Sequence, residues 1–247
     1  MIRREFDRGL EGNVEQFTTI AIPGIPEIKE GDDIGTIICK QSRGIGGLLG
    51  GDIIVVASKI ISKAEGRIID KSSIKVSDKA NELSQATGKP APVCQLILDE
   101  SSDLIVRGHT IVAHHKLGYI LTSAGVDQVD EFHISLIPED PDLSAKKMRE
   151  KIEELSGKKI AVVITDSEGR EDRAGAGAVA LGVSGIDSIR RTASPSGKQQ
   201  EETISDMIAN AASLLIGQRG KNTPAVVLRG LNIGRNTESR LQDYLRK

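Results

Sequence analysis

The sequence predicts an α+β fold with mixed, largely antiparallel sheets and flanking helices. Short β-branched segments follow one another at residues 103–106, 110–114 and 119–122, with Gly108 and Gly118 between them, and such consecutive strands pair antiparallel. Helical segments stand between groups of strands rather than after every strand, which argues against a regular βαβ array. The chain also lacks a Gly-x-Gly-x-x-Gly that opens a helix and a Gly-x-x-x-x-Gly-Lys-Ser/Thr loop, so neither a Rossmann fold nor a P-loop is expected.

Apolar patterning places the elements of the first part of the chain. A β-branched segment predicts a strand at residues 17–22, which a Gly/Pro turn ends. Asp32 and Asp33 precede isoleucines at helical spacing, which predicts a short helix with acidic residues at its positive end. A glycine loop at residues 41–51 then leads into an apolar strand at 52–57.

The same patterning places the remaining elements. Helices are expected at residues 77–86, 92–100, 140–156, 200–216 and 237–246. Further strands are expected at residues 159–165, 174–185 and 224–228. We expect one domain over residues 1–247, with two interwoven subdomains as an alternative, after a polar leader at residues 1–16.

Composition excludes several classes of protein. Lys and Arg total 33 against 35 Asp and Glu, a net charge of -2, so no nucleic-acid partner or anionic membrane is expected. No apolar run approaches the roughly 20 residues of a membrane span. The N-terminus has no apolar signal core, and the two cysteines fit buried thiols, so we expect a cytoplasmic protein.

The strongest local signal for chemistry is an acidic turn that leaves an apolar strand. Asp166 and Ser167 supply a carboxylate and a hydroxyl, which are oxygen ligands for Mg²⁺ or Mn²⁺. Arg170 and Arg173 follow, and their guanidinium groups can hold phosphate or carboxylate oxygens. The same residues also fit an ordinary turn in which Asp166 caps backbone amides, and the motif alone leaves both readings open.

Two further strand ends carry charged residues. Asp127 follows small residues and a strand, which fits either a metal ligand or a solvated acidic turn. Lys59 and Lys63, four residues apart after the strand at 52–57, would neutralise a polyphosphate if they lie at the edge of a sheet. The four histidines have no spacing typical of a zinc site.

Taken in order, these motifs resemble one protein family. The segments are 23–33, 58–67 (Ser-Lys-Ile-Ile-Ser-Lys-Ala-Glu-Gly-Arg), 124–127 (Ala-Gly-Val-Asp), 165–170 (Thr-Asp-Ser-Glu-Gly-Arg) and 224–230. They resemble the coenzyme F420-0:γ-glutamyl ligases from about residue 20 to residue 232. The resemblance implies an α+β homodimer that uses GTP, Mg²⁺ or Mn²⁺ (two per site) and K⁺ to add L-glutamate to F420-0, a phospholactyl deazaflavin, through an acyl phosphate.

The resemblance also implies roles for individual residues. The expected contacts to GTP are Ile25, Pro26, Glu27, Ile28, Ser58, Lys59, Lys63 and the residue at Asp130. The expected metal ligands are Asp127 and Asp166 for one cation, and Ser167 with Gln218 for a second. Arg170 and Arg173 are expected to add positive charge as the phosphoryl group moves.

The chain departs from the family pattern in two places. Asp130 stands where the family usually has asparagine, so a neutral nucleotide contact has become an acid. A glycine-arginine-lysine-aspartate stretch before the long C-terminal helix is replaced by residues 190–198, which we expect to form a mobile basic loop that selects the acceptor. The alternative functions are therefore ligation of a different acceptor, or nucleotide binding without the ligase reaction.

Overall fold

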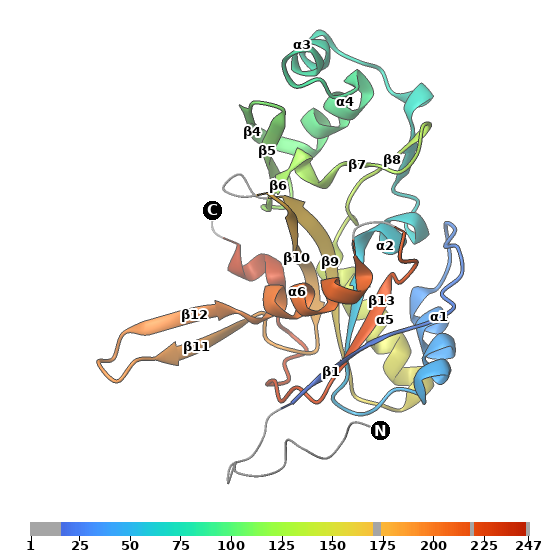
Figure 1. Cartoon of the computed structure of the whole chain (residues 1–247), viewed down its shortest axis with the longest axis vertical. Helices are drawn as coiled ribbons and strands as arrows, with labels where there is room; N and C mark the ends of the chain where they lie inside the picture. Colours follow the sequence, from blue (N-terminus) through green and yellow to red (C-terminus); the bar gives the residue numbers. More distant parts are fainter. Residues whose placement is uncertain (1–15, 170–173, 218–219, 246–247) are drawn as a thin grey trace.

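A computed structural model of the chain describes residues 16–169, 174–217 and 220–245 (Figure 1). Its central sheet has five strands in the order β1-β13-β2-β9-β10. These strands are β1 (Thr18–Ala21), β13 (Ala225–Arg229), β2 (Ile53–Ala57), β9 (Ala161–Gly169) and β10 (Ala176–Ser184). Only the β2–β9 pair in this sheet is parallel, which confirms the predicted mixed, largely antiparallel α+β fold.

Helices cover both faces of the central sheet. The helices α1 (Ile34–Gln41), α2 (Ser58–Ala64) and α5 (Pro141–Ser156) share one hydrophobic core with one face. The helix α6 (Ile204–Ile216) shares a second core with the opposite face. Because successive side chains of β2 enter opposite cores, its residues are buried on both sides, which explains its unbroken apolar sequence.

A second lobe lies above the central sheet in Figure 1 and has its own hydrophobic core. It contains α3 (Asp78–Thr87), α4 (Ala91–Glu100) and the three-stranded sheet of β4 (Ser101–Arg107), β5 (Thr110–His115) and β6 (Ile120–Thr122). The strands β3 (Ile68–Asp70), β7 (Asp127–Gln128) and β8 (His133–Ser135) form another small sheet. The successive strands at 103–122 therefore pair antiparallel, as predicted.

A buried ion cluster ties this lobe to the end of α2. The Glu100 carboxylate lies 3.0 Å from Nη2 of Arg67, 2.8 Å from Nζ of Lys116 and 3.3 Å from Nε2 of His115. Nε of Arg67 also donates to the carbonyl of Ile137, which precedes α5, at 3.2 Å. Burial raises the pKa of Glu100, but hydrogen bonds from His115 and Lys116 and the charge of Arg67 outweigh it and lower the pKa to about 2.

The structure corrects three expectations. The helix predicted at 200–216 begins only at Ile204, because Gln199–Thr203 forms strand β12, which pairs with β11 (Ile189–Ala193). The expected mobile loop at 190–198 is thus part of a hairpin, residues 189–203, called the arm below, which projects away from the body (Figure 1). The helix predicted at 237–246 is a single 3₁₀ turn, Leu241–Tyr244, whose N-terminal amides are held by the carboxylate of Asp142.

Opposite charges explain why the arm pairs as strands. Nε of Arg190 lies 2.7 Å from Glu202, and Nε of Arg191 lies 3.0 Å from Glu201, in the register of the two strands. Two basic residues of the segment expected to select the acceptor, Arg190 and Arg191, are therefore paired across the hairpin. No helix in the described ranges is long and apolar enough to cross a membrane.

Candidate functional site

Strand topology brings distant segments to one edge of the central sheet. Because β2 and β9 are parallel, with Ala57 opposite Thr165, the residues that follow them leave the sheet side by side. Ser58 therefore opens α2 next to Asp166. The loop after β1 and the turn before β13 meet the same edge, because β13 runs antiparallel to both β1 and β2.

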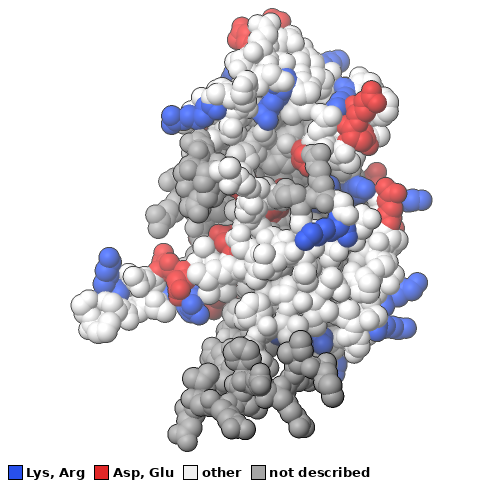
Figure 2. All heavy atoms as spheres, in the orientation of Figure 1, with Lys and Arg blue, Asp and Glu red and all other residues white. Residues whose placement is uncertain are grey.

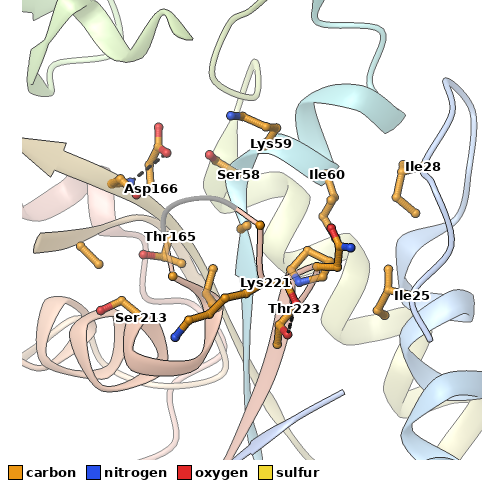
Figure 3. Close-up of a pocket in the computed structure, with 18 of the residues that line it drawn as sticks. Ile25, Ile28, Ser58, Lys59, Ile60, Thr165, Asp166, Ser213, Lys221 and Thr223 are labelled. Carbon is orange, nitrogen blue, oxygen red and sulfur yellow. Dashed lines mark hydrogen bonds between the residues drawn. The ribbon is translucent and has the colours of Figure 1, made fainter. Parts of the chain in front are cut away.

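A cavity of about 720 Å³ opens at this edge (Figure 3). Figure 3 shows Ser58, Lys59 and Asp166 on one side of it and Ile25 and Ile28 on the other. Its lining residues come from the loop after β1, from α2, β9 and β10, and from the end of α6 with the turn before β13: Ile25, Pro26, Glu27, Ile28, Ala57, Ser58, Lys59, Ile60, Lys63, Thr165, Asp166, Ser167, Ala176, Gly177, Ala178, Ser213, Ile216, Gly217, Gly220, Lys221, Asn222, Thr223 and Pro224.

Asp166 is the carboxylate that burial perturbs most in this cavity. Burial raises its pKa to about 6, although hydrogen bonds from the Ser167 amide and the Ser58 hydroxyl and the charge of Lys59 act to lower the pKa. The charge of Asp127 raises the pKa further, so the two carboxylates are close enough to repel each other. A cation between them would relieve this repulsion.

Asp127 is joined to the cavity by an ion pair. Nζ of Lys59 lies 2.5 Å from Oδ2 of Asp127, and the two side chains are 41% and 48% exposed. The ammonium of Lys59 thus lies beside Asp127, and its charge also acts on Asp166. A positive group therefore already lies beside the carboxylates that the family resemblance assigns to a metal.

A left-handed turn sets the position of Asp127. Ser123, Ala124 and Gly125 have φ values of 52°, 55° and 67°, a conformation that side-chain-bearing residues rarely adopt. A Cβ on Gly125 would lie only 2.5 Å from the side chain of Ile137, so only glycine fits there. Glu168 on β9 accepts the Thr122 amide at 2.8 Å, which holds this turn against the cavity edge.

The described structure brings most of the predicted nucleotide contacts together. The loop residues Ile25, Pro26, Glu27 and Ile28 and the α2 residues Ser58, Lys59 and Lys63 all line the cavity, as do Asp166 and Ser167. The two lysines lie on the helix α2, which begins at the end of β2. Nζ of Lys63 lies 3.4 Å from Glu27.

Asp130 lies apart from the other predicted nucleotide contacts. Its carboxylate accepts the backbone amides of Phe132 and His133 at 2.7 and 2.8 Å and contacts the His133 ring at 3.0 Å. It therefore stabilises its own turn and does not line the cavity. The predicted residues Arg170, Arg173 and Gln218 lie outside the described residues.

Part of the cavity wall was missed in the sequence. Ser213 on α6 and the turn residues Lys221, Asn222 and Thr223 line it. Nζ of Lys221 donates to the carbonyl of Leu214 at 2.9 Å, and Asn222 has a φ of 50°. The glycines at 217 and 220, just before an apolar strand, were the available signal for a turn at the sheet edge.

The donor chemistry fits a hard divalent cation. Asp127, Asp166, Ser58 and Ser167 offer carboxylate and hydroxyl oxygens, and the Lys59 ammonium shows that the pair of carboxylates accepts a positive group. Among the described residues no three His, Cys, Asp or Glu side chains gather as a metal site. Any cation here would therefore need hydroxyl, backbone, water or substrate oxygens besides the two carboxylates.

Comparison with known proteins identifies the family. The family model of F420-0:γ-glutamyl ligase matches residues 24–230. The chain belongs to this family. It is 39% identical over 220 residues to the coenzyme F420:L-glutamate ligase of Archaeoglobus fulgidus (86% of this chain, 87% of the relative) and 40% identical over 224 residues to that of Methanothermobacter thermautotrophicus (87% and 89%). The corresponding ligase of Methanocaldococcus jannaschii is 39% identical over 191 residues, 74% of this chain and 77% of the relative.

The match to the F420-0:γ-glutamyl ligase family covers the whole cavity. Its described lining residues, from Ile25 to Pro224, all lie within the matched range. The family resemblance stated from the motifs is therefore confirmed, and the chain is a member of a ligase family.

Proposed function

We propose that this chain ligates L-glutamate to F420-0, using GTP and a divalent cation, Mg²⁺ or Mn²⁺. The observation that carries this proposal is the convergence of Lys59, Asp127 and Asp166 at the mouth of a cavity that also contains Lys63. Such a combination of cationic side chains and oxygen ligands suits a nucleoside triphosphate that binds together with a metal ion. The names of the relatives supply the amino acid and the coenzyme.

The proposed roles follow the walls of the cavity. Ile25 and Ile28 give an apolar wall for a base or sugar, whereas Lys59 and Lys63 neutralise phosphate oxygens. Asp127 and Asp166 would hold one cation, and Ser167 would serve a second. A bound divalent cation would supply charge neutralisation during phosphoryl transfer.

An amide bond requires an activated carboxyl group, which sets the order of the chemistry. The acceptor carboxylate attacks the γ-phosphorus of GTP, so a carboxyl–phosphate bond forms and the bond to GDP breaks. The glutamate amine then attacks the acyl carbon, releases inorganic phosphate and loses a proton to form the amide. The chain's residues need only position the reactants and stabilise charge, because no protein nucleophile takes part.

The proposal is tested by supplying every reactant. Protein incubated with GTP, Mn²⁺, K⁺, L-glutamate and F420-0 is expected to yield a product heavier by one glutamate residue, with equal amounts of GDP and phosphate, measured by mass spectrometry. Omitting glutamate or GTP is the control. If GTP and Mn²⁺ bind but no glutamate is added to F420-0, the alternative of another acceptor or a nucleotide-binding module replaces the ligase assignment.

We also propose that the protein is a homodimer joined through the arm. An isolated two-stranded hairpin is only marginally stable in water, and the arm's outer strand edges are unpaired within the described chain. Acidic and basic side chains both lie along it (Figure 2). On α6, the helix that follows the arm, Met207 and Leu214 are 50% and 75% exposed and lie seven residues apart on one helix face.

Shortening the arm should therefore separate the subunits. We expect wild-type protein to have twice the 26.4 kDa chain mass in light scattering, and a variant with residues 191–201 replaced by a short Gly-Asn turn to have the mass of one chain. The body of the variant should stay folded, because the arm is not part of its hydrophobic cores. A monomeric wild type, or a shortened variant that remains dimeric, would contradict the proposed interface.

A further inference from the structure

Lys59 has two roles that it cannot perform at once. Its ammonium lies 2.5 Å from Asp127 and interacts with Asp166, where the proposed function places a divalent cation. The same side chain lines the cavity in which the proposed function places the nucleotide phosphates. A divalent cation placed between the carboxylates would take the position of this ammonium, which would then be free to turn to the phosphates.

We propose that Lys59 is an exchangeable internal counter-ion, which neutralises the carboxylates of the ligand-free protein and turns to the phosphates when a divalent cation replaces it. The inference rests on the proposed function, because it assumes a cation between Asp127 and Asp166. It adds that the cation and the nucleotide assist each other's binding. Such coupling is reciprocal, so each ligand strengthens the other by the same factor.

The exposure of the Lys59–Asp127 ion pair favours replacement of the ammonium by a cation. Lys59 and Asp127 are both about half exposed, and ion pairs of this kind are weak. The lysine stem is flexible, and α2 holds its backbone beside the cavity. Asp127 and Asp166 repel each other, so the pair favours having one positive group beside it in either state.

Lys63 provides a matched control within the same cavity. It lies one helical turn after Lys59 on α2, but its ammonium pairs with Glu27 at 3.4 Å instead of Asp127. Lys63→Met therefore removes one positive charge from the cavity without emptying the position beside the carboxylates. A difference between Lys59→Met and Lys63→Met isolates direct competition from the general effect of charge.

The first measurement is a titration of Mn²⁺ into the protein without nucleotide. The electron paramagnetic resonance signal of free Mn²⁺ reports how much of the ion is bound. We expect Lys59→Met to bind Mn²⁺ about fivefold more tightly than wild type, the factor that corresponds to an exposed ion pair of about 1 kcal/mol. Lys63→Met should change the affinity by less than about twofold. Equal or weaker Mn²⁺ binding by Lys59→Met than by Lys63→Met overturns the inference and leaves the proposed function standing.

The second measurement is the affinity for GTP in the presence of EDTA. It reports whether Lys59 is available to the phosphates when no metal ion is bound. Asp127→Asn releases Lys59 and should tighten metal-free GTP binding about fivefold, and this gain should disappear when Lys59→Met is added to the same chain. A gain that persists in the double variant overturns the inference. If wild-type protein binds no Mn²⁺ even with saturating GTP, the proposed function itself fails.

Discussion

Asp166→Asn should reduce GTP-dependent glutamate ligation about a hundredfold to a thousandfold, while the fold stays intact. The substitution keeps the shape of the side chain but removes the charge that a cation needs. Loss of one electrostatic partner at the reacting phosphates has an effect of this size. Because Asp166 carries a raised pKa of about 6, its ionised form is costly in the ligand-free protein, and the variant should be no less stable than wild type.

The measurement is product formation at saturating Mn²⁺ and GTP, with urea unfolding as the check on stability. Asp99→Asn is the matched control, because Asp99 is an exposed carboxylate on α4 that bonds only to Gln95 among the contacts described. The control should retain wild-type turnover. Unchanged turnover in Asp166→Asn at every Mn²⁺ concentration would show that this carboxylate does not hold the metal.

Glu100→Gln should destabilise the protein by about 3 kcal/mol at pH 7, because it leaves Arg67 and Lys116 without their buried counter-charge. Glu100 has a pKa of about 2 in the folded protein against 4.5 when unperturbed, and this shift corresponds to about 3 kcal/mol. A carboxylate with a lowered pKa stabilises the fold fully above pH 4.5. That contribution disappears as the pH falls from 4.5 to 2.

Urea unfolding of wild type and Glu100→Gln at pH 7, 4.5 and 3 measures this difference. The gap in unfolding free energy should be largest at pH 7 and narrow steadily at lower pH. Glu82→Gln is the control, because Glu82 is an exposed residue of α3. A gap that stays constant between pH 7 and 3 would show that the ionised form of Glu100 does not stabilise the link between the lobes.

The convergence of the candidate site residues could largely be predicted from the sequence, because these residues follow strand ends. Asp166 and Lys59 come directly after apolar strands, and the parallel pairing of β2 with β9 brings them together. Asp127 could be named as a candidate, but its position depends on a left-handed turn at Ser123 and Ala124, where neither residue favours positive φ. Local propensity does not predict such a turn, and its neighbours Ile137 and Glu168 lie in distant parts of the sequence.

Other features depended on contacts distant in sequence. Residues 199–203 have the composition of a helix start, and only their register with residues 189–193 makes them a strand. Arg67 belongs to the most specific motif of the chain, yet its partners are Glu100 and the carbonyl of Ile137, in segments 33 and 70 residues away. The motif therefore indicated importance without showing that this arginine joins two lobes.

The order of strands in the central sheet also determines when this sheet can be completed during synthesis. β13, near the C-terminus, lies between β1 and β2, so the first two strands of the sheet have no partner on that side until residue 229 has been made. For most of the synthesis, the edge of β2 that will pair with β13 therefore has no partner strand. Long-range pairing of this kind is also slow. Completion of the cavity is therefore a late event, because the turn residues that line it immediately precede the strand that completes the sheet.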